Sequence, residues 1–461
     1  MLIILTDALN DLRQLIKGED IMSDQINDNY KDPDYDPPMG ESIALGLQHV
    51  LAMFVSNLTP AIIIGGAAGF AFGGSDAVFL IQMSMLFAGI ATLFQTIGFG
   101  PVGARLPVMQ GTSFAFIPIM IPIVKTAGMG ALYGGIIVGG LFHAALGMFI
   151  GRFRHWFPPL VSGLVILAIG LALIPVGIKY AAGGAAAFQM NAPEWGSMSK
   201  WSLALIVIIV ALGFKFYARG VLSSAAILIG LFAGYIVGIF MGVVNFSGVE
   251  KASWFALPVP FKYGFELHAA AIIGMCLMAI VSAIETIGDI SGITKGGANR
   301  EATNEEIQGG TYADGLGTAI AGVFGGLPNT SFSQNVGLVS MTGVMSRWVV
   351  TIGAIFLVLC GLIPKIGAIV ASMPMSVLGG GVILMFGMIA SAGINMLSAV
   401  SWNRRNMLIL ALSLSVGLGL QAVPNAMQHL PGTMKLLMTS GLLPSAFLAV
   451  LLNIILPEEI E

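Results

Sequence analysis

Charged side chains are scarce along this chain. Asp, Glu, Lys and Arg make up only 9% of its 461 residues, whereas 56% are hydrophobic; typical soluble domains carry about 25% charged residues. The formal net charge is −3 and no basic cluster occurs, so no nucleic-acid partner is expected. This composition predicts a polytopic protein of the lipid bilayer.

Cysteines and catalytic motifs are also nearly missing. The two cysteines, Cys276 and Cys360, each lie in an apolar run and are interpreted as small buried hydrophobes, so no disulfide, metal site or cofactor is expected. Residues 286–289 are Thr-Ile-Gly-Asp rather than Gly-x-Gly-Asp, and neither Gly-x-Ser-Gly nor His-Glu-x-x-His occurs. The chain is therefore not expected to be an enzyme.

Apolar runs long enough to cross a membrane recur almost from end to end and predict an all-α membrane protein. We place fourteen segments at 43–66, 77–98, 107–123, 130–150, 158–178, 201–217, 221–243, 267–290, 311–325, 329–342, 344–371, 376–397, 406–423 and 437–456. An even count puts both termini on one side of the membrane, and every loop arginine falls on that side. This predicts a protein of the inner membrane with both termini in the cytoplasm. Residues 1–41 are predicted to be an acidic, solvated cytoplasmic tail.

Two of these segments, 107–123 and 329–342, are too short and too polar to span as plain helices. Pro328, Asn329 and Gly337 break the second one, and broken backbone at membrane depth is tolerated where it is buried in protein or lines a cavity. The segments are third and tenth, and both contain Thr-Ser-Phe, at 112–114 and 330–332. This spacing predicts a 7+7 inverted repeat in which the broken segments meet at a substrate site.

Few ionisable residues lie inside the apolar segments, and each is costly enough to be a functional candidate. Glu285 and Asp289 are four residues apart and share one face of a helix. Glu285 is predicted to carry a proton and to accept hydrogen bonds from a ligand; alternatively it braces a broken helix. For Asp289 and for Asp314, two interpretations are equally favoured: the side chain braces neighbouring backbone, or it has a direct role in the site.

Neutral side chains complete the candidate site. Gln334 is suited to binding the amide edge of a small heterocycle, whereas Asn335 is predicted to support the helix break. Phe114, beside the small Ser113, offers a face for stacking on a planar ring, although simple packing is the alternative. His49 in the first segment is predicted to brace the site.

Four motifs resemble those of one transporter family. Gln334-Asn335-Val336-Gly337, followed by Thr342-Gly343, resembles the signature of the nucleobase–ascorbate transporters. Gln48-His49, the Glu285–Asp289 stretch and Ala313-Asp314-Gly315 are similar to motifs of the bacterial xanthine and uric acid permeases. The resemblance covers essentially the whole chain after the tail.

The resemblance implies a core domain (42–150 and 263–371) that moves against a gate domain (151–262 and 372–461), in a homodimer that imports a purine together with protons. It also implies roles for individual residues. Glu285 and Gln334 would hold the purine edge, Phe114 would stack on it, and backbone near Ser113 and Ser333 would complete the pocket. Asp314, His49, Asp289 and Asn335 would support the site or couple it to protons.

Departures from the family pattern favour purines over uracil. Uracil carriers tend to have Glu where this chain has Gln334 and His where it has Asp289, and the small Ser113 favours uric acid over xanthine. A uracil or other nucleobase permease remains an alternative. A second alternative is an anion exchanger on the same fold, which should offer helix N-termini or a basic residue to its substrate. No lysine or arginine is expected near Ser113 or Gln334 in the apolar segments, and Glu285 would repel an anion.

Overall fold

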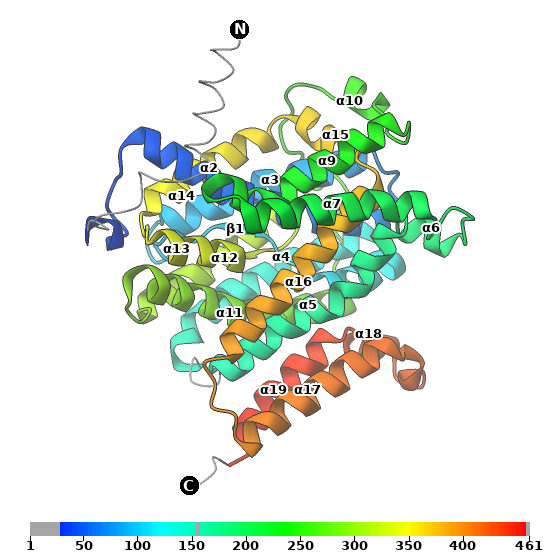
Figure 1. Ribbon diagram of the computed structural model, residues 1–461. Helices are drawn as coiled ribbons and strands as arrows, with labels where there is room; N and C mark the ends of the chain where they lie inside the picture. Colours follow the sequence, from blue (N-terminus) through cyan, green and yellow to red (C-terminus); the bar gives the residue numbers. More distant parts are fainter. Residues whose placement is uncertain (1–27, 154–156, 458–461) are drawn as a thin grey trace.

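Helices form most of the structure, a computed structural model that describes residues 28–153 and 157–457 (Figure 1). The longer helices are α2 (Met39–Ala67), α3 (Ser75–Thr96), α4 (Ile117–Phe153), α5 (Pro159–Ala181), α7 (Met198–Tyr217), α9 (Ala226–Phe240), α11 (Ala269–Ala298), α12 (Asn304–Val323), α13 (Ser333–Thr342), α14 (Arg347–Gly361), α16 (Met375–Leu397), α17 (Arg404–Ala422) and α19 (Leu442–Ile455). The short helical elements are η1 (Asp28–Lys31), α6 (Ala185–Gln189), α8 (Gly220–Ser224), α10 (Ser247–Lys251), α15 (Pro364–Ala371), η3 (Pro424–Met427) and α18 (Gly432–Met438).

Within the described residues, eight helices are long and apolar enough to cross a membrane. The number rises to ten if two bent pairs, α14 with α15 and α18 with α19, each form one broken span. The prediction of a helical, multi-pass membrane protein is therefore confirmed. The count of fourteen segments and the 7+7 repeat stay predictions, because α9 is short and α12 is less apolar than a typical span.

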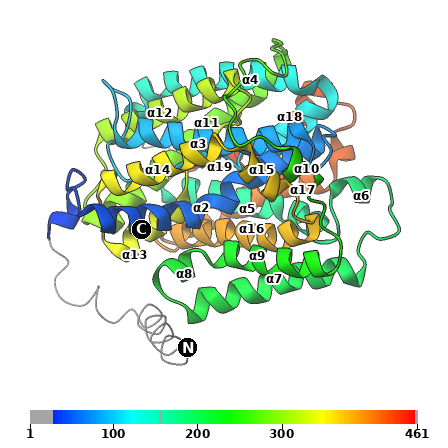
Figure 2. The same cartoon turned by 90° about the horizontal axis from the view of Figure 1, so that it is seen from above.

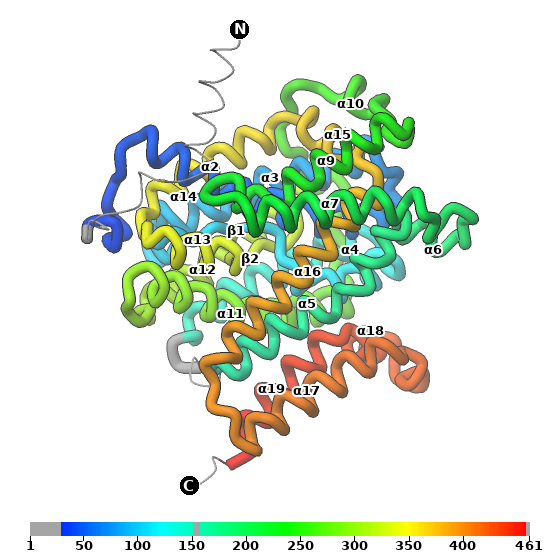
Figure 3. Tube along the Cα trace, viewed as in Figure 1, coloured from blue at the N-terminus to red at the C-terminus, as the bar shows by residue number. Residues whose placement is uncertain are grey.

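The two broken segments meet in the middle of the molecule, as predicted (Figure 3). Each begins with a three-residue strand, β1 (Gln110–Thr112) or β2 (Asn329–Ser331), and continues as a helix. The strands pair antiparallel, with Gly111 opposite Thr330. On the first segment, the helical part of α4 is interrupted at Gly128, whose φ of 84° is left-handed and favours glycine.

Side chains from neighbouring helices satisfy the backbone of this small sheet. Asn57 Oδ1 on α2 accepts hydrogen bonds from the backbone N–H and the hydroxyl of Thr112, at 2.8 and 3.1 Å. Thr318 Oγ1 on α12 accepts from the Asn329 N–H at 3.0 Å. Extended backbone can therefore persist at membrane depth, because protein groups replace the water that hydrocarbon lacks.

The surrounding helices fall into closely packed neighbours (Figure 2). Helix α4 packs against α11 and α12, and α14 packs against α2 and α3. Helix α16 packs against α5 and α7, and α17 packs against α19. Some of these contacts are possible only for glycine: a Cβ on Gly315 of α12 would lie 2.1 Å from the backbone nitrogen of Ala144 on α4. Such close approach is typical of helix association in membranes.

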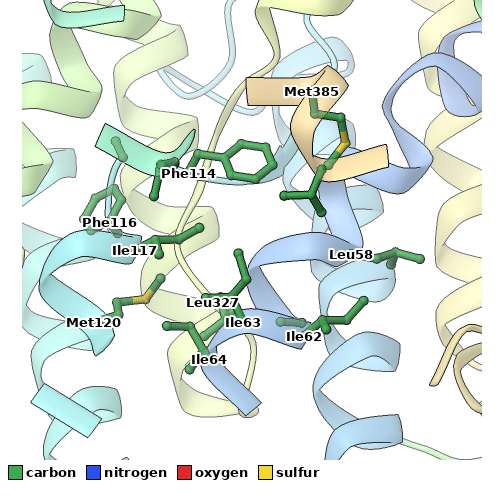
Figure 4. Packing of buried hydrophobic residues seen from close by; sticks show 14 of the residues in the cluster. Leu58, Ile62, Ile63, Ile64, Phe114, Phe116, Ile117, Met120, Leu327 and Met385 are labelled. Atoms are coloured by element: carbon green, nitrogen blue, oxygen red, sulfur yellow. The ribbon is translucent and has the colours of Figure 1, made fainter. Parts of the chain in front are cut away.

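An apolar cluster supports the first broken segment from one side (Figure 4). Phe114 and Ile117 lie there with Ile63 of α2, Leu327 before β2 and Met385 of α16, and all five are buried. Since these residues come from four separate stretches of the chain, their burial fixes where β1 and β2 lie relative to α2 and α16.

Residues 1–27 of the predicted acidic tail lie outside the described residues, but the part nearest α2 makes specific contacts. Tyr30 Oη donates to Glu41 Oε1 at 2.9 Å, and burial followed by the hydrogen bond and charge of Glu41 raises the pKa of Tyr30 to about 12. The Tyr30 carbonyl accepts from the Met345 N–H at 2.7 Å, and Asp34 Oδ1 accepts from Arg347 Nε at 2.6 Å. This segment is therefore attached to the junction of α13 and α14.

Candidate functional site

A cavity of about 440 Å³ is lined by two groups of elements. One group is β1, β2, α11 and α13, and the other is α5, α7, α8 and α16. Four of the predicted substrate-binding residues line it: Glu285, Gln334, Phe114 and Ser333. They come from α11, α13 and the segment after β1, so the fold gathers residues that are up to 220 positions apart in the sequence.

Among the residues that the structure describes, Glu285 is the only acidic one that lines the cavity. It lies in the middle of α11, and its Oε2 atom is buried without a hydrogen-bond partner. A buried carboxyl oxygen without a partner is expensive, and such atoms in native proteins call for a functional explanation. This oxygen is therefore available to a ligand N–H or a proton, and among the described residues no hydrogen bond links it to a broken helix.

Gln334 and Phe114 approach the same cavity from different elements. Gln334 is in the first turn of α13, is half-buried, and makes no side-chain hydrogen bond to another described residue, so both ends of its amide are available. The Phe114 ring is 6% exposed and packs edge-on against Phe386, with ring centroids 5.5 Å apart. Phe114 thus packs in the apolar cluster and borders the cavity at once.

The two predicted serines differ in their positions. Ser333 lines the cavity, and its hydroxyl donates to Asp289 Oδ1 at 2.7 Å. Ser113 is fully buried behind the lining, between Thr112 and Phe114, and its hydroxyl has no partner. Its backbone N–H donates to the Pro328 carbonyl at 2.8 Å, so Ser113 continues the pairing of the two strands.

Asp289 holds the start of the second broken segment. Its Oδ2 atom accepts from the Ser331 hydroxyl and its Oδ1 atom from the Ser333 hydroxyl, both at 2.7 Å. The carboxyl is buried on α11 one turn after Glu285, but it does not line the cavity. This geometry corresponds to the bracing alternative for Asp289.

We expect Asp289→Ala to lower transport much more than Asp289→Asn. Alanine leaves the hydroxyls of the buried Ser331 and the half-buried Ser333 without this acceptor, at about 1–3 kcal/mol for the buried one, whereas the asparagine amide can accept from one serine and donate to the other. The thermal stability of the purified protein and the initial uptake rate measure the difference. Equal behaviour of the two variants would show that the carboxylate charge, rather than its hydrogen bonds, matters here.

Asp314 joins three elements around β1. Its Oδ1 atom accepts hydrogen bonds from Gln95 Nε2 on α3, at 2.8 Å, and from Gln110 Nε2 on β1. Its Oδ2 atom accepts from the Thr286 hydroxyl on α11. Asp314 is fully buried and does not line the cavity, so its contacts position neighbours of Glu285 rather than a ligand.

His49 and Asn335 connect α2 to α13. Asn335 Nδ2 donates to His49 Nδ1 and to the His49 backbone carbonyl, both at 3.0 Å. Donation to Nδ1 requires the tautomer with its proton on Nε2. Neither residue lines the cavity, and both side chains brace the turn of α13 that carries Gln334.

The opposite wall of the cavity was not foreseen from the sequence. Met388, Ser391, Ala392 and Asn395 form one face of α16, and Ile169 lies on α5. The spacing of the α16 residues is that of successive helical turns, and the polar Ser391 and Asn395 within an apolar segment are the signal that could have identified this face.

The expectation that no lysine or arginine lies near Gln334 is wrong. Lys215, in the last turn of α7, lines the same cavity. Its segment is far from Gln334 in the sequence, and it reaches the site because α7 packs on α16 and α8 packs on α2. Packing between distant segments of this kind leaves no trace in the sequence around Lys215.

The comparisons with known proteins decide the family. Residues 40–426 match the family model Xan_ur_permease, which is described as a permease family. The chain belongs to the nucleobase–ascorbate transporter family. This nucleobase–ascorbate transporter is 36% identical to the xanthine permease of Bacillus subtilis, over 90% of this chain and 94% of the relative. It is 38% identical to the uric acid transporter of Escherichia coli, over 90% and 86% of the two chains.

Solved structures agree with the fold. The transmembrane domain of a cyanobacterial bicarbonate transporter matches 90% of this transporter with a TM-score of 0.56 and 16% identity, and 97% of that chain is covered. A murine anion transporter of solute carrier family 26 in its inward-facing state matches 87%, with a TM-score of 0.56, 13% identity and 70% of its own chain covered. The relatives are permeases, which confirms that the chain is a transporter rather than an enzyme.

Proposed function

We propose that this protein is a proton-coupled symporter that imports an oxopurine, xanthine or uric acid, across the inner membrane. The observation that carries the proposal is the pairing of an unpartnered carboxyl, Glu285, with a free amide, Gln334, in one cavity. An oxopurine presents N–H donors and carbonyl acceptors along its edge. A carboxyl and an amide can satisfy both kinds of group, and Phe114 borders the ring.

The mechanism follows from how the cavity is divided. Glu285 and Gln334 are on elements of the predicted core domain, whereas Lys215 and Asn395 are on elements of the predicted gate domain. A proton binds at Glu285 and the purine binds against the core. The core then moves relative to the gate, and both ligands leave inward. Binding of the proton and binding of the purine are coupled, because both involve the carboxyl of Glu285 and each changes the affinity for the other by the same factor.

The cavity is open at one end, where the lining residues Lys215, Met341 and Asn395 are exposed. These residues lie near the ends of α7, α13 and α16, on the side that the loop arginines assign to the cytoplasm. A second cavity of about 750 Å³ lies at the other end of α2, between 72–75 and 243–253. We interpret the structure as an inward-facing state with cytoplasmic termini, and the homodimer follows from the family resemblance.

We favour uric acid as a substrate because of Ser113. We expect Ser113→Asn to reduce urate uptake about tenfold more than xanthine uptake. Extra volume at this fully buried position presses Thr112 and Phe114 toward the cavity, at a cost of about 1–3 kcal/mol, and urate carries an additional oxo group. The ratio of the two KM values measures the effect. Equal losses would remove the reason for favouring urate.

The test of the function is uptake of labelled xanthine and labelled uric acid into cells that lack their own carriers. Each is competed with unlabelled uracil, with and without a protonophore. We expect purine uptake that stops with the protonophore and ignores uracil. Uptake blocked by uracil would support the alternative of a uracil permease, and uptake indifferent to the protonophore would refute proton coupling.

A further inference from the structure

Two ionisable side chains line the substrate cavity among the described residues, Glu285 and Lys215. They come from different helices, Glu285 from α11 and Lys215 from α7. Glu285 Oε2 has no hydrogen-bond partner, so no lysine nitrogen neutralises that oxygen directly. A ligand bound in this cavity would therefore share it with one carboxyl and one ammonium group.

Lys215 is held in a fixed place at the open end of the cavity. Its backbone carbonyl accepts a hydrogen bond from the Ser223 hydroxyl at 3.2 Å. Ser224, the next residue of α8, has its hydroxyl bound by Gln48 Nε2 of α2 at 2.8 Å. The turn that carries Lys215 is therefore tied to the helix that also braces α13. The side chain itself is exposed, and its ammonium group is a pure donor with a positive charge.

We propose that Lys215 determines which charge state of the purine is accepted, by attracting the anionic form at the mouth of the cavity. This inference rests on the proposed function. Uric acid is a stronger N–H acid than xanthine and is largely an anion at neutral pH, when xanthine is still largely neutral. Until Glu285 takes up its proton, its carboxylate repels a purine anion that approaches the cavity, and the lysine that lines the same cavity offsets that repulsion.

The two groups of lining residues would therefore have different roles in binding. Gln334 and Glu285 on the core wall bind the edge of any oxopurine, because hydrogen bonding does not require a net charge. Lys215 on the gate wall adds an attraction that only an anion experiences. The lysine therefore contributes to discrimination between urate and neutral purines, in addition to the space near Ser113.

The experiment measures binding of labelled urate and labelled xanthine to the purified full-length protein in detergent. It compares the wild type with Lys215→Gln, Lys215→Arg and Lys200→Gln. Lys200 is at the opposite end of α7 and does not line the cavity, so its variant removes the same charge from the same helix. We expect Lys215→Gln to weaken urate binding about fivefold, which corresponds to ~1 kcal/mol. Xanthine binding at slightly acidic pH should be unchanged, and Lys215→Arg and Lys200→Gln should bind like the wild type.

A second measurement needs no variant. Raising the ionic strength from about 0.01 to 1 M shortens the Debye length from about 30 to 3 Å, so wild-type affinity for urate should fall more than its affinity for neutral xanthine. Equal loss of both ligands in Lys215→Gln, or equal salt dependence for both, would overturn the proposal. Wild-type protein that binds neither purine would instead refute the proposed function, so the two failures are distinguishable.

Discussion

Glu285→Gln is expected to abolish the proton-driven accumulation of xanthine while leaving a folded, purine-binding protein in the membrane. Glutamine has nearly the shape of glutamate and keeps a carbonyl acceptor, so the ligand can still be held from α11. It cannot take up or release a proton. Since Glu285 is the only acid that lines the cavity among the described residues, no other lining group can replace this step.

The size of the effect follows from the energy that a proton supplies. Moving one elementary charge across 100 mV is worth about 2.3 kcal/mol, enough to sustain roughly 40-fold accumulation of a neutral purine carried with one proton. The variant should lose this accumulation entirely. Exchange of labelled for unlabelled xanthine across vesicle membranes needs no net proton movement, and it should continue.

Glu305→Gln is the matched control, because Glu305 is an exposed acid at the start of α12 that does not line the substrate cavity. It should accumulate xanthine like the wild type. Wild-type accumulation and pH dependence in Glu285→Gln would refute the assigned role of the carboxyl. If the variant loses both exchange and accumulation, and the protein still elutes as one species, Glu285 is needed for binding rather than for coupling.

The general position of the site was predictable from a conflict within the sequence. Pro328, Asn329 and Gly337 cannot continue a helix, yet they lie between apolar runs, and hydrocarbon excludes unsatisfied backbone. That conflict located the second broken segment, and the shared Thr-Ser-Phe located its partner. The register in which Gly111 faces Thr330 was not predictable, because it is set by Asn57 and Thr318 on other helices.

The roles of the buried acids could be narrowed only by the structure. Periodicity places Glu285 and Asp289 on one helix face, but it does not say which carboxyl reaches a cavity and which meets two serine hydroxyls. The prediction from the sequence also omitted neutral amide side chains. Asn57 binds Thr112 of the first broken segment, and Gln95 binds the carboxyl of Asp314, yet a search for charged residues in apolar segments does not find these two amides.

The wall of the cavity that contains Ser391, Asn395 and Lys215 was not predicted, for a different reason. Ser391 and Asn395 are mild interruptions of an apolar helix, and Lys215 closes a helix where a basic residue is ordinary. Their place at the cavity comes from the packing of α7 on α16 and of α16 against α2 and α13, which are contacts between distant parts of the sequence. Sequence patterns describe one element at a time. Only the elements that carry unusual residues can therefore be assigned to a cavity from the sequence.

Gln334→Glu is expected to weaken xanthine binding by about 10- to 100-fold and to shift preference toward uracil. The glutamine amide donates and accepts, and so matches a ring edge with an N–H next to a carbonyl. An ionised glutamate only accepts, which leaves a ring carbonyl facing a carboxylate at a cost of about 1–3 kcal/mol. The new acid would also share the cavity with Glu285, and like charges in one cavity repel.

Competition measurements with xanthine, uric acid and uracil distinguish this change in recognition from general damage. Gln334→Asn keeps the amide but shortens the side chain, so it should lose affinity without gaining uracil. Gln428→Glu adds the same charge at a residue outside the cavity and should behave like the wild type. Wild-type selectivity in Gln334→Glu would mean that Gln334 does not contact the ring. Recognition would then have to rest on Glu285, on the hydroxyls of lining residues such as Ser333, and on the backbone of β1 and β2.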